Sequence, residues 1–298
     1  MSISVPLEPR TRPTRDDLVR AQYADAELVA DYADAYTGWG PTARYHHSRL
    51  HAVDEVLRSR AGGDLLDIGC GPGMMVRHLL DTRPGDFRIT ACDRSAAMID
   101  AVVARAGRAE VTPAVGDIEN MPFPAGTFDV ALAMGVLEYT DVASALREIA
   151  RVLRPGGLLV ATMLNPQSPY RLVEWGVFWP ARRALGSLER AVGVAPEHRH
   201  GARRTGIKAL SARRFRHELW QAGLQPEDPL FYDVTALVPP VDRFVRRWDH
   251  SWRDHPERTV SRGVARGLGS GYLMPALRPQ PHTALAGHRR ATSQTLVG

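Results

Sequence analysis

Short apolar runs alternate with amphipathic stretches through the middle of the chain, between residues 61 and 164. Apolar runs bounded by glycine, proline or charged residues predict buried strands. They lie at residues 64–69, 87–93, 110–115, 128–134 and 157–164. Stretches with apolar residues at helical spacing separate these runs, at residues 74–81, 95–106 and 141–153. This alternation predicts a parallel sheet with helices on both faces, which is the core of a doubly wound α/β domain.

Helical patterns flank this core on both sides. Before it, Leu50, Val53 and Leu57 share one helical face, which is part of a helical N-terminal cap expected over residues 16–60. After it, residues 165–209 are expected to form an inserted helical lid. Residues 210–279 then complete the core with a helix and two more strands. We expect the terminal stretches, residues 1–15 and 280–298, to be disordered tails.

The composition is that of a globular protein. Of its 298 residues 44% are apolar, and no apolar run approaches the roughly 18 residues that a membrane span needs. The N-terminus lacks the apolar centre of a signal peptide. Cys70 and Cys92 are the only cysteines and form no Cys-x-x-Cys pair, which indicates a reducing compartment without a disulfide framework. We therefore expect a soluble, cytoplasmic protein.

The formal net charge of +5 raises the question of nucleic-acid binding. Lys208 is the only lysine, so nearly all of the basic residues are arginines, as a GC-rich coding bias produces. These arginines are interspersed with acids along the chain, and no nucleic-acid recognition motif accompanies them. The scattered arginines and the missing motif therefore argue against a nucleic-acid partner, despite the net positive charge.

A glycine-rich turn follows the first predicted strand, in the stretch LLDIGCGPGMM at residues 65–75. Gly69, Gly71 and Gly73 allow a ligand to approach the backbone closely. A dinucleotide fingerprint would need a further glycine at position 74, where this chain has Met74. Asp67 would also repel a pyrophosphate, whereas it would attract a ligand that carries an ammonium and a sulfonium. The turn thus favours a cationic ligand over a dinucleotide.

The segment LLDIGCGPG resembles the first motif of the class I S-adenosylmethionine-dependent methyltransferases. Later segments resemble further motifs of that family in the same order, over roughly residues 65–162. The resemblance implies S-adenosylmethionine as cofactor, with Asp93 accepting hydrogen bonds from both ribose hydroxyls and with Asp117 and Ile118 at the edge of the adenine. The implied cofactor-binding residues are Asp67, Gly69, Cys70, Gly71, Gly73, Asp93, Arg94, Asp117, Ile118 and Met134.

Each of the three acids also has an ordinary interpretation. Asp67 could be a loop or capping acid, Asp93 could serve a dinucleotide site, and Asp117 could be a turn residue. Asp67 lies within the first predicted strand, Asp93 ends the second and Asp117 follows the third. Their occurrence in the family's order favours the cofactor site over the three separate explanations.

Direct methyl transfer requires the protein to position the acceptor and, for a protonated acceptor, to remove its proton. Candidate catalytic residues are His46 and His47 in the N-terminal cap, and Glu138 and Tyr139 after the fourth strand. A histidine at a helix edge more often serves packing, and Glu138 could instead orient a neighbouring residue. No metal-ligand motif is present, so no metal is expected.

Aromatic residues mark the expected acceptor side. Tyr36 and Tyr45 lie in the N-terminal cap, and Trp175, Phe178 and Trp179 lie in the insertion beside several arginines. We expect these five residues to contact the acceptor, with the insertion as a lid. A helix resting on a membrane and a dimer contact are the alternatives for the insertion.

The sequence therefore predicts a Rossmann-like α/β fold with a seven-stranded sheet. The family resemblance implies the strand order 3-2-1-4-5-7-6, with strand 7 antiparallel. The expected reaction is transfer of a methyl group from S-adenosylmethionine to an oxygen, nitrogen or carbon of a hydrophobic small molecule, with specialised metabolism as the expected setting. Two alternatives stay open: a lipid or quinone methyltransferase at a membrane surface, and an S-adenosylmethionine-binding protein with a non-methyl reaction or a scaffolding role. Homo-oligomerisation is left open.

Overall fold

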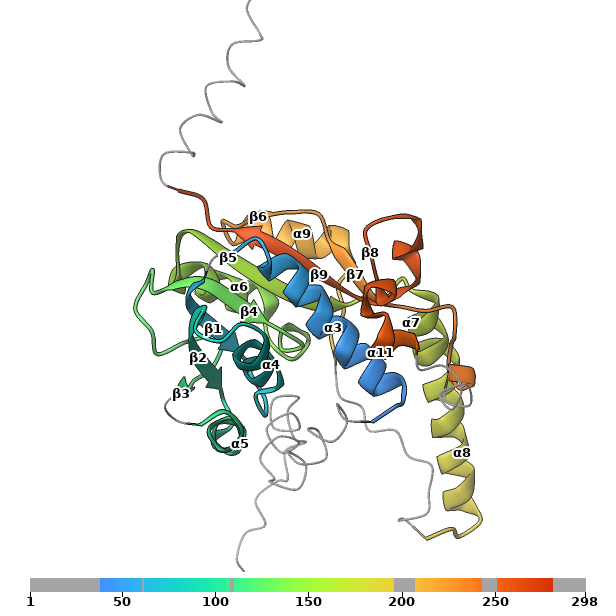
Figure 1. The fold of residues 1–298 in the computed structure, drawn as a ribbon. Coiled ribbons are helices and arrows are strands. Elements are labelled where there is room, and N and C mark those ends of the chain that lie inside the picture. Colours follow the sequence, from blue (N-terminus) through green and yellow to red (C-terminus); the bar gives the residue numbers. More distant parts are fainter. Residues whose placement is uncertain (1–37, 61, 108–109, 196–206, 243–250, 281–298) are drawn as a thin grey trace, which may run out of the picture.

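A single sheet organises the molecule (Figure 1). The computed structural model describes residues 38–60, 62–107, 110–195, 207–242 and 251–280. Within these ranges the strand order is β3-β2-β1-β4-β5-β9-β7-β8, with β6 paired to β9. The strands are β1 (Gly63–Ile68), β2 (Phe87–Asp93), β3 (Val111–Val115), β4 (Phe128–Ala133), β5 (Leu153–Leu164), β6 (Gln225–Pro226), β7 (Leu230–Val234), β8 (Val260–Ser261) and β9 (Gly269–Leu277).

The predicted strand order is confirmed in its main part. Strands β1 to β5 pair in parallel, and β9 pairs antiparallel with both β5 and β7. Strand β9 therefore occupies the place of the expected seventh strand, and β7 that of the sixth. The sheet has two strands more than predicted, because the short β6 and β8 also pair with it. Each has two residues, too few to produce a periodic pattern in the sequence.

The alternation of side chains along the strands builds two cores, one on each face of the sheet. In β1, Leu65 joins one apolar cluster and its neighbour Leu66 joins the other. In β9, Leu273 and Tyr272 divide in the same way. Both faces are covered, which explains why these strands read as nearly continuous apolar runs.

Helices cover both faces of the sheet (Figure 1). The cluster that includes Leu65 also contains residues of α3, α4 and α5, whereas the other cluster contains residues of α6 and α9. These helices are α3 (Pro41–Leu57), α4 (Met74–Thr82), α5 (Ala96–Ala106), α6 (Val142–Val152) and α9 (Ala212–Gln221). Side chains cap three of them, since Ser95, Asp141 and Ser211 accept hydrogen bonds from the backbone of the first turn.

The remaining elements are short or belong to the insertion. The insertion begins with α7 (Pro169–Val173), continues through a π-helical turn, η2 (Glu174–Phe178), and ends with α8 (Trp179–Ala191). The other helical turns are η1 (Leu137–Tyr139), α11 (Ser251–Asp254), η4 (Pro256–Thr259) and η5 (Val264–Leu268). Helix α3 is the described part of the predicted N-terminal cap, and it packs against β7 and β9. In the described residues we find no helix with both the length and the apolarity to cross a bilayer.

Candidate active site

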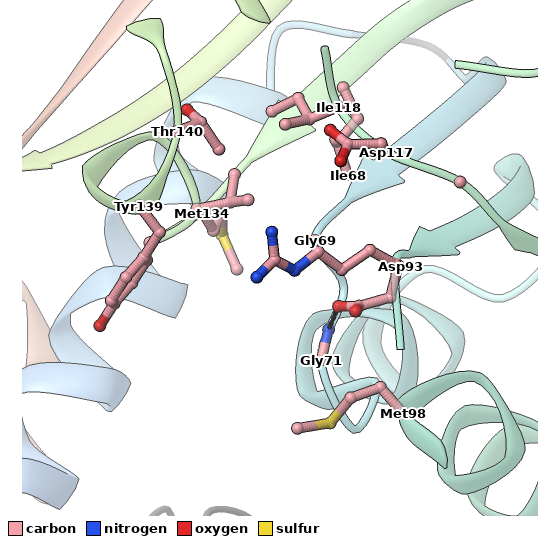
Figure 2. A pocket seen from close by; sticks show the side chains of 14 residues that line it. Ile68, Gly69, Gly71, Asp93, Met98, Asp117, Ile118, Met134, Tyr139 and Thr140 are labelled. Carbon is pink, nitrogen blue, oxygen red and sulfur yellow. Dashed lines mark hydrogen bonds between the residues drawn. The ribbon is translucent and has the colours of Figure 1, made fainter. Parts of the chain in front are cut away.

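A cleft opens at the carboxyl ends of β1, β2 and β4, where a doubly wound fold places its ligands (Figure 2). Residues from the turns that follow these strands line it. The lining residues are Ile68, Gly69, Gly71, Asp93, Arg94, Met98, Gly116, Asp117, Ile118, Met134, Gly135, Val136, Tyr139 and Thr140. Seven of the ten residues that the sequence predicts for cofactor binding are therefore brought together here.

The glycine turn forms one wall of the cleft. Gly69, Gly71 and Gly73 have φ values of 64°, 52° and 79°, a region that other residues seldom adopt. A Cβ atom on Gly69 would also lie 2.6 Å from Cγ2 of Val136. Gly73 is the N-cap of α4, so it shapes the turn without lining the cleft. The turn therefore keeps its wall free of side chains, as a closely bound ligand requires.

Asp67 lies beneath this turn and has no hydrogen-bond partner for one of its carboxylate oxygens. Its side chain belongs to β1, it is 2% exposed, and Oδ2 is buried without a partner within the described structure. Burial raises the pKa of Asp67 to about 7, although the charge of Arg49 opposes this shift. Ionising this buried carboxyl is costly because no partner balances the charge. A cationic ligand beside it would supply that partner and stabilise the carboxylate.

Asp93 ends β2 and presents its carboxylate to the cleft (Figure 2). Its Oδ2 accepts a hydrogen bond from the backbone N–H of Gly71 at 3.0 Å, and its Oδ1 accepts one from the N–H of Ser95 at 2.9 Å. Burial raises the pKa of Asp93, and these backbone donors oppose the shift. Each oxygen retains a lone pair, so the fixed carboxylate can accept two further hydrogen bonds.

Asp117 and Ile118 line another part of the cleft. The Oδ1 atom of Asp117 accepts a hydrogen bond from the backbone N–H of Glu119 at 2.9 Å, which fixes the side chain. Gly116 precedes them, and a Cβ atom there would lie 2.7 Å from Cδ of Pro122. Met98, from α5, also lines the cleft.

Arg49 is a residue that the sequence analysis missed. It lies on α3, it is 3% exposed, and its Nη2 donates to Nδ1 of His46 at 3.2 Å. A Cβ atom on Gly135, which lines the cleft, would lie 2.5 Å from Nη1 of Arg49. Burial raises the pKa of both Asp67 and Glu138, and the charge of Arg49 opposes this rise. Its position three residues after His46, on the same helical face, could have indicated that the two side chains interact. It did not stand out because arginine is abundant throughout the chain.

The candidate catalytic residues lie in different surroundings. Tyr139 lines the cleft, whereas Glu138 is buried beside it and receives a hydrogen bond from the backbone of Leu164. Burial raises the pKa of Glu138 to about 7. Burial and Arg49 lower the pKa of His46 to about 2, so its ring is neutral and orients Arg49. The ring of His47 packs against Trp252, with centroids 5.3 Å apart.

The remaining predicted residues are not among those that line the cleft. Gly73 and Asp67 support the turn, as does Cys70, whose thiol pKa is raised by burial. Tyr45 donates to or accepts from the hydroxyl of Tyr232 at 2.9 Å.

The aromatic residues of the insertion lie in η2 and α8, outside the lining of the cleft. Phe178 and Trp179 contact each other, and Arg182 lies over both rings. Trp175 belongs to η2. Tyr36 lies outside the described residues. Contact of these residues with an acceptor stays a prediction.

The strand order and the glycine turn after β1 define a class of protein: a Rossmann-like methyltransferase fold with a cleft at the carboxyl ends of its parallel strands. In the described residues no group of histidine, cysteine and acidic side chains is arranged to hold a metal.

Comparisons with known proteins agree with this class. Residues 66–161 match the family model described as a methyltransferase domain. The malonyl-[acyl-carrier protein] O-methyltransferase of Serratia marcescens is 37% identical over 122 residues, which are 41% of this chain and 45% of the relative. The ubiquinone/menaquinone biosynthesis C-methyltransferase UbiE of Cereibacter sphaeroides is 34% identical over 135 residues, which are 44% of this chain and 53% of the relative.

A solved structure extends the similarity of the fold. A SAM-dependent methyltransferase from Thermotoga maritima is 17% identical with a TM-score of 0.56, and the match covers 86% of this chain and 99% of that one. The chain spans about half the length of the curated relatives it matches. Residues 66–161 therefore form a methyltransferase domain, and the fold around them is one that S-adenosylmethionine-dependent methyltransferases share.

Proposed function

We propose that the protein transfers a methyl group from S-adenosylmethionine to an oxygen, nitrogen or carbon nucleophile of a hydrophobic small molecule by direct displacement. The observation that carries this proposal is that Asp93 and Asp117 line one glycine-walled cleft, with Asp67 buried beneath its glycine turn. A ligand with a cationic amino-acid part, a ribose and an adenine would use all three acids. The partial match to curated methyltransferases supports the same activity.

The residues of the cleft fit each part of this cofactor. Asp93 would accept both ribose hydroxyls, and Asp117 with the backbone of Ile118 would bind the adenine edge. Asp67 would balance the positive charge of the methionine part. Arg49 lies beside Gly135 at the same end of the cleft, where its guanidinium would pair with the carboxylate of that part.

When bound, the cofactor supplies a methyl group that its sulfonium charge already activates. The chain then has to bring the acceptor into line with that group and exclude water. Tyr139 lines the cleft and would contact the acceptor. Glu138, whose pKa of about 7 suits a base near neutral pH, would take the acceptor's proton. Residues of α7 to α8 would cover the acceptor as a lid.

Glu138 can be tested as the base once an acceptor is found. We expect Glu138→Gln to lower turnover on the order of 100-fold and to leave cofactor affinity unchanged. Because the carboxylate form is the base, wild-type turnover should rise with pH through about 7, and the Gln variant should lose this rise. The exposed Glu110→Gln serves as the control. An unchanged pH profile in Glu138→Gln would assign Glu138 an orienting role.

The proposed function is tested by ligand-dependent melting and by mass spectrometry. We expect S-adenosylmethionine and S-adenosylhomocysteine to raise the melting temperature while NAD leaves it unchanged. Incubation with hydrophobic acceptors should then add the mass of one methyl group to one of them. Stabilisation by NAD alone would refute the cofactor. Cofactor binding without transfer across quinones, lipids and hydroxylated or amino aromatics would favour a non-methyl reaction or a scaffolding role.

A quinone or another lipid-like acceptor is the second candidate within this function. The similarity to a ubiquinone/menaquinone C-methyltransferase favours it, and so does the exposed apolar surface of the insertion described below. The cytoplasmic location and the role in specialised metabolism stay predictions. Quinone analogues therefore belong in the first acceptor screen, beside small phenols and amines.

A further inference from the structure

The consecutive helical elements η2 and α8, with the C-cap residue Val192, carry an apolar stripe that faces solvent. Val177, Leu185, Leu188 and Val192 are 61%, 43%, 61% and 70% exposed, and Ala181 is exposed between them. Their spacings of four, four, three and four residues place them on one side of the helix. Figure 1 shows α8 extending away from the sheet along one side of the molecule. Within the described structure this stripe is not part of either apolar core.

The insertion also contains more basic than acidic residues. Residues 165–209 contain eight arginine and lysine residues and three glutamates, a net charge of +5, which equals that of all 298 residues. The other residues therefore have equal numbers of acids and bases. On α8 itself Arg182, Arg183 and Arg190 outnumber Glu189. This excess of basic residues gives the insertion a positive field.

Polar contacts fix the base of the insertion to the body of the protein. The hydroxyl of Tyr170 donates to Oδ2 of Asp242 at 2.8 Å, and both side chains are buried. Arg171 donates to the backbone carbonyl of Ser270 at 3.2 Å and to Oε2 of Glu174 at 2.5 Å. These contacts hold α7 against β9, so the helix that follows α7 is mounted on a defined element of the fold.

An exposed aliphatic stripe on a helix whose other sides carry arginines is the pattern of a helix that lies in the surface of a membrane. The aliphatic side chains enter the boundary of the acyl chains, and the arginines contact the headgroups. A second copy of the chain is a weaker occupant, because it would bring two insertions of the same positive charge together. An anionic surface meets both the charge and the apolar stripe.

We propose that the exposed apolar face of η2 and α8, formed by Val177, Ala181, Leu185, Leu188 and the C-cap residue Val192, docks the protein on membranes that contain anionic lipids. The inference concerns binding alone and does not depend on the proposed methyl transfer. It also leaves the aromatic residues of η2 available for contact with an acceptor.

Vesicle flotation with the full chain tests this proposal without cofactor or acceptor. We expect the wild type to float with vesicles of phosphatidylcholine and phosphatidylglycerol, and to float much less with phosphatidylcholine alone or at high salt. The double variant Leu185→Glu and Leu188→Glu should bind roughly tenfold or more weakly, since two apolar anchors become charged. Trp220→Glu is the control, because Trp220 is 53% exposed on α9, away from the insertion.

Several results would overturn the proposal. They are absence of wild-type binding to the anionic vesicles, equal binding by the wild type and the double variant, and an equal loss in Trp220→Glu. Light scattering provides a further check. A wild-type dimer that the double variant converts to a monomer would assign the stripe to a second copy instead. Melting curves of the three proteins verify that the variants fold, since all substituted side chains are exposed.

Discussion

Replacing Asp93 by alanine should weaken the binding of S-adenosylhomocysteine by about 100- to 10,000-fold. Asp93 offers two remaining lone pairs to the two ribose hydroxyls, and each hydrogen bond to a charged group contributes about 1.5–3 kcal/mol. A tenfold change in affinity corresponds to about 1.4 kcal/mol, which gives the expected range. Isothermal titration calorimetry measures the effect directly and needs no acceptor.

The matched control for Asp93→Ala is Asp81→Ala. Asp81 is an exposed acid of α4 that pairs with Arg77 on the same helix, so its removal should leave the affinity unchanged. A second ligand separates ribose recognition from damage to the turn, since Asp93 also accepts from Gly71 and Ser95. A 2′-deoxyribose analogue should bind the wild type more weakly, and Asp93→Ala should discriminate less between the two ligands. Equal discrimination by both proteins would contradict the assignment.

The affinity for S-adenosylhomocysteine should fall as the pH is lowered below 7, by about 50-fold between pH 7 and pH 5. The reason is the raised pKa of Asp67, about 7 in the free protein. The carboxylate form attracts the ligand's ammonium, whereas the protonated form does not. Below the pKa each pH unit therefore reduces the binding-competent fraction about tenfold, and above it the affinity is constant. Binding near pH 6 should release a proton.

Asp67→Asn identifies the titrating group. The variant should bind weakly at neutral pH and should show little change in affinity between pH 7 and pH 5. This control is needed because burial also raises the pKa of Glu138 to about 7. Titrations in two buffers of different ionisation enthalpy measure the proton release, which should disappear in Asp67→Asn. A flat wild-type profile would show that Asp67 does not carry the charge recognition.

The cofactor half of the site was predictable because it lies in local sequence. Asp93 ends β2 and Asp117 follows β3, and parallel strands bring such residues to one edge of the sheet. The order of the main strands was predictable from the family resemblance. The short strands β6 and β8 were not, because they form by pairing with neighbours that already exist rather than by a pattern of their own.

The other half of the site depends on contacts between distant segments. Arg49 reaches the cleft only because α3 packs on β7 and β9, about two hundred residues later in the chain. Its pairing with His46, and the resulting low pKa of that histidine, could not be deduced from a helical pattern. The placement of Glu138 beside the backbone of Leu164 likewise requires the finished sheet.

The position of β9 has a consequence for how the protein is made. This strand comes last among the described elements, yet it lies inside the sheet, between β5 and β7. A ribosome-bound chain that lacks it would leave the edges of both neighbours unpaired, with α3 deprived of much of its packing surface. Arg49 would then lack its final support. The cofactor cleft can therefore be completed only after β9 has been synthesised, about two hundred residues beyond the glycine turn.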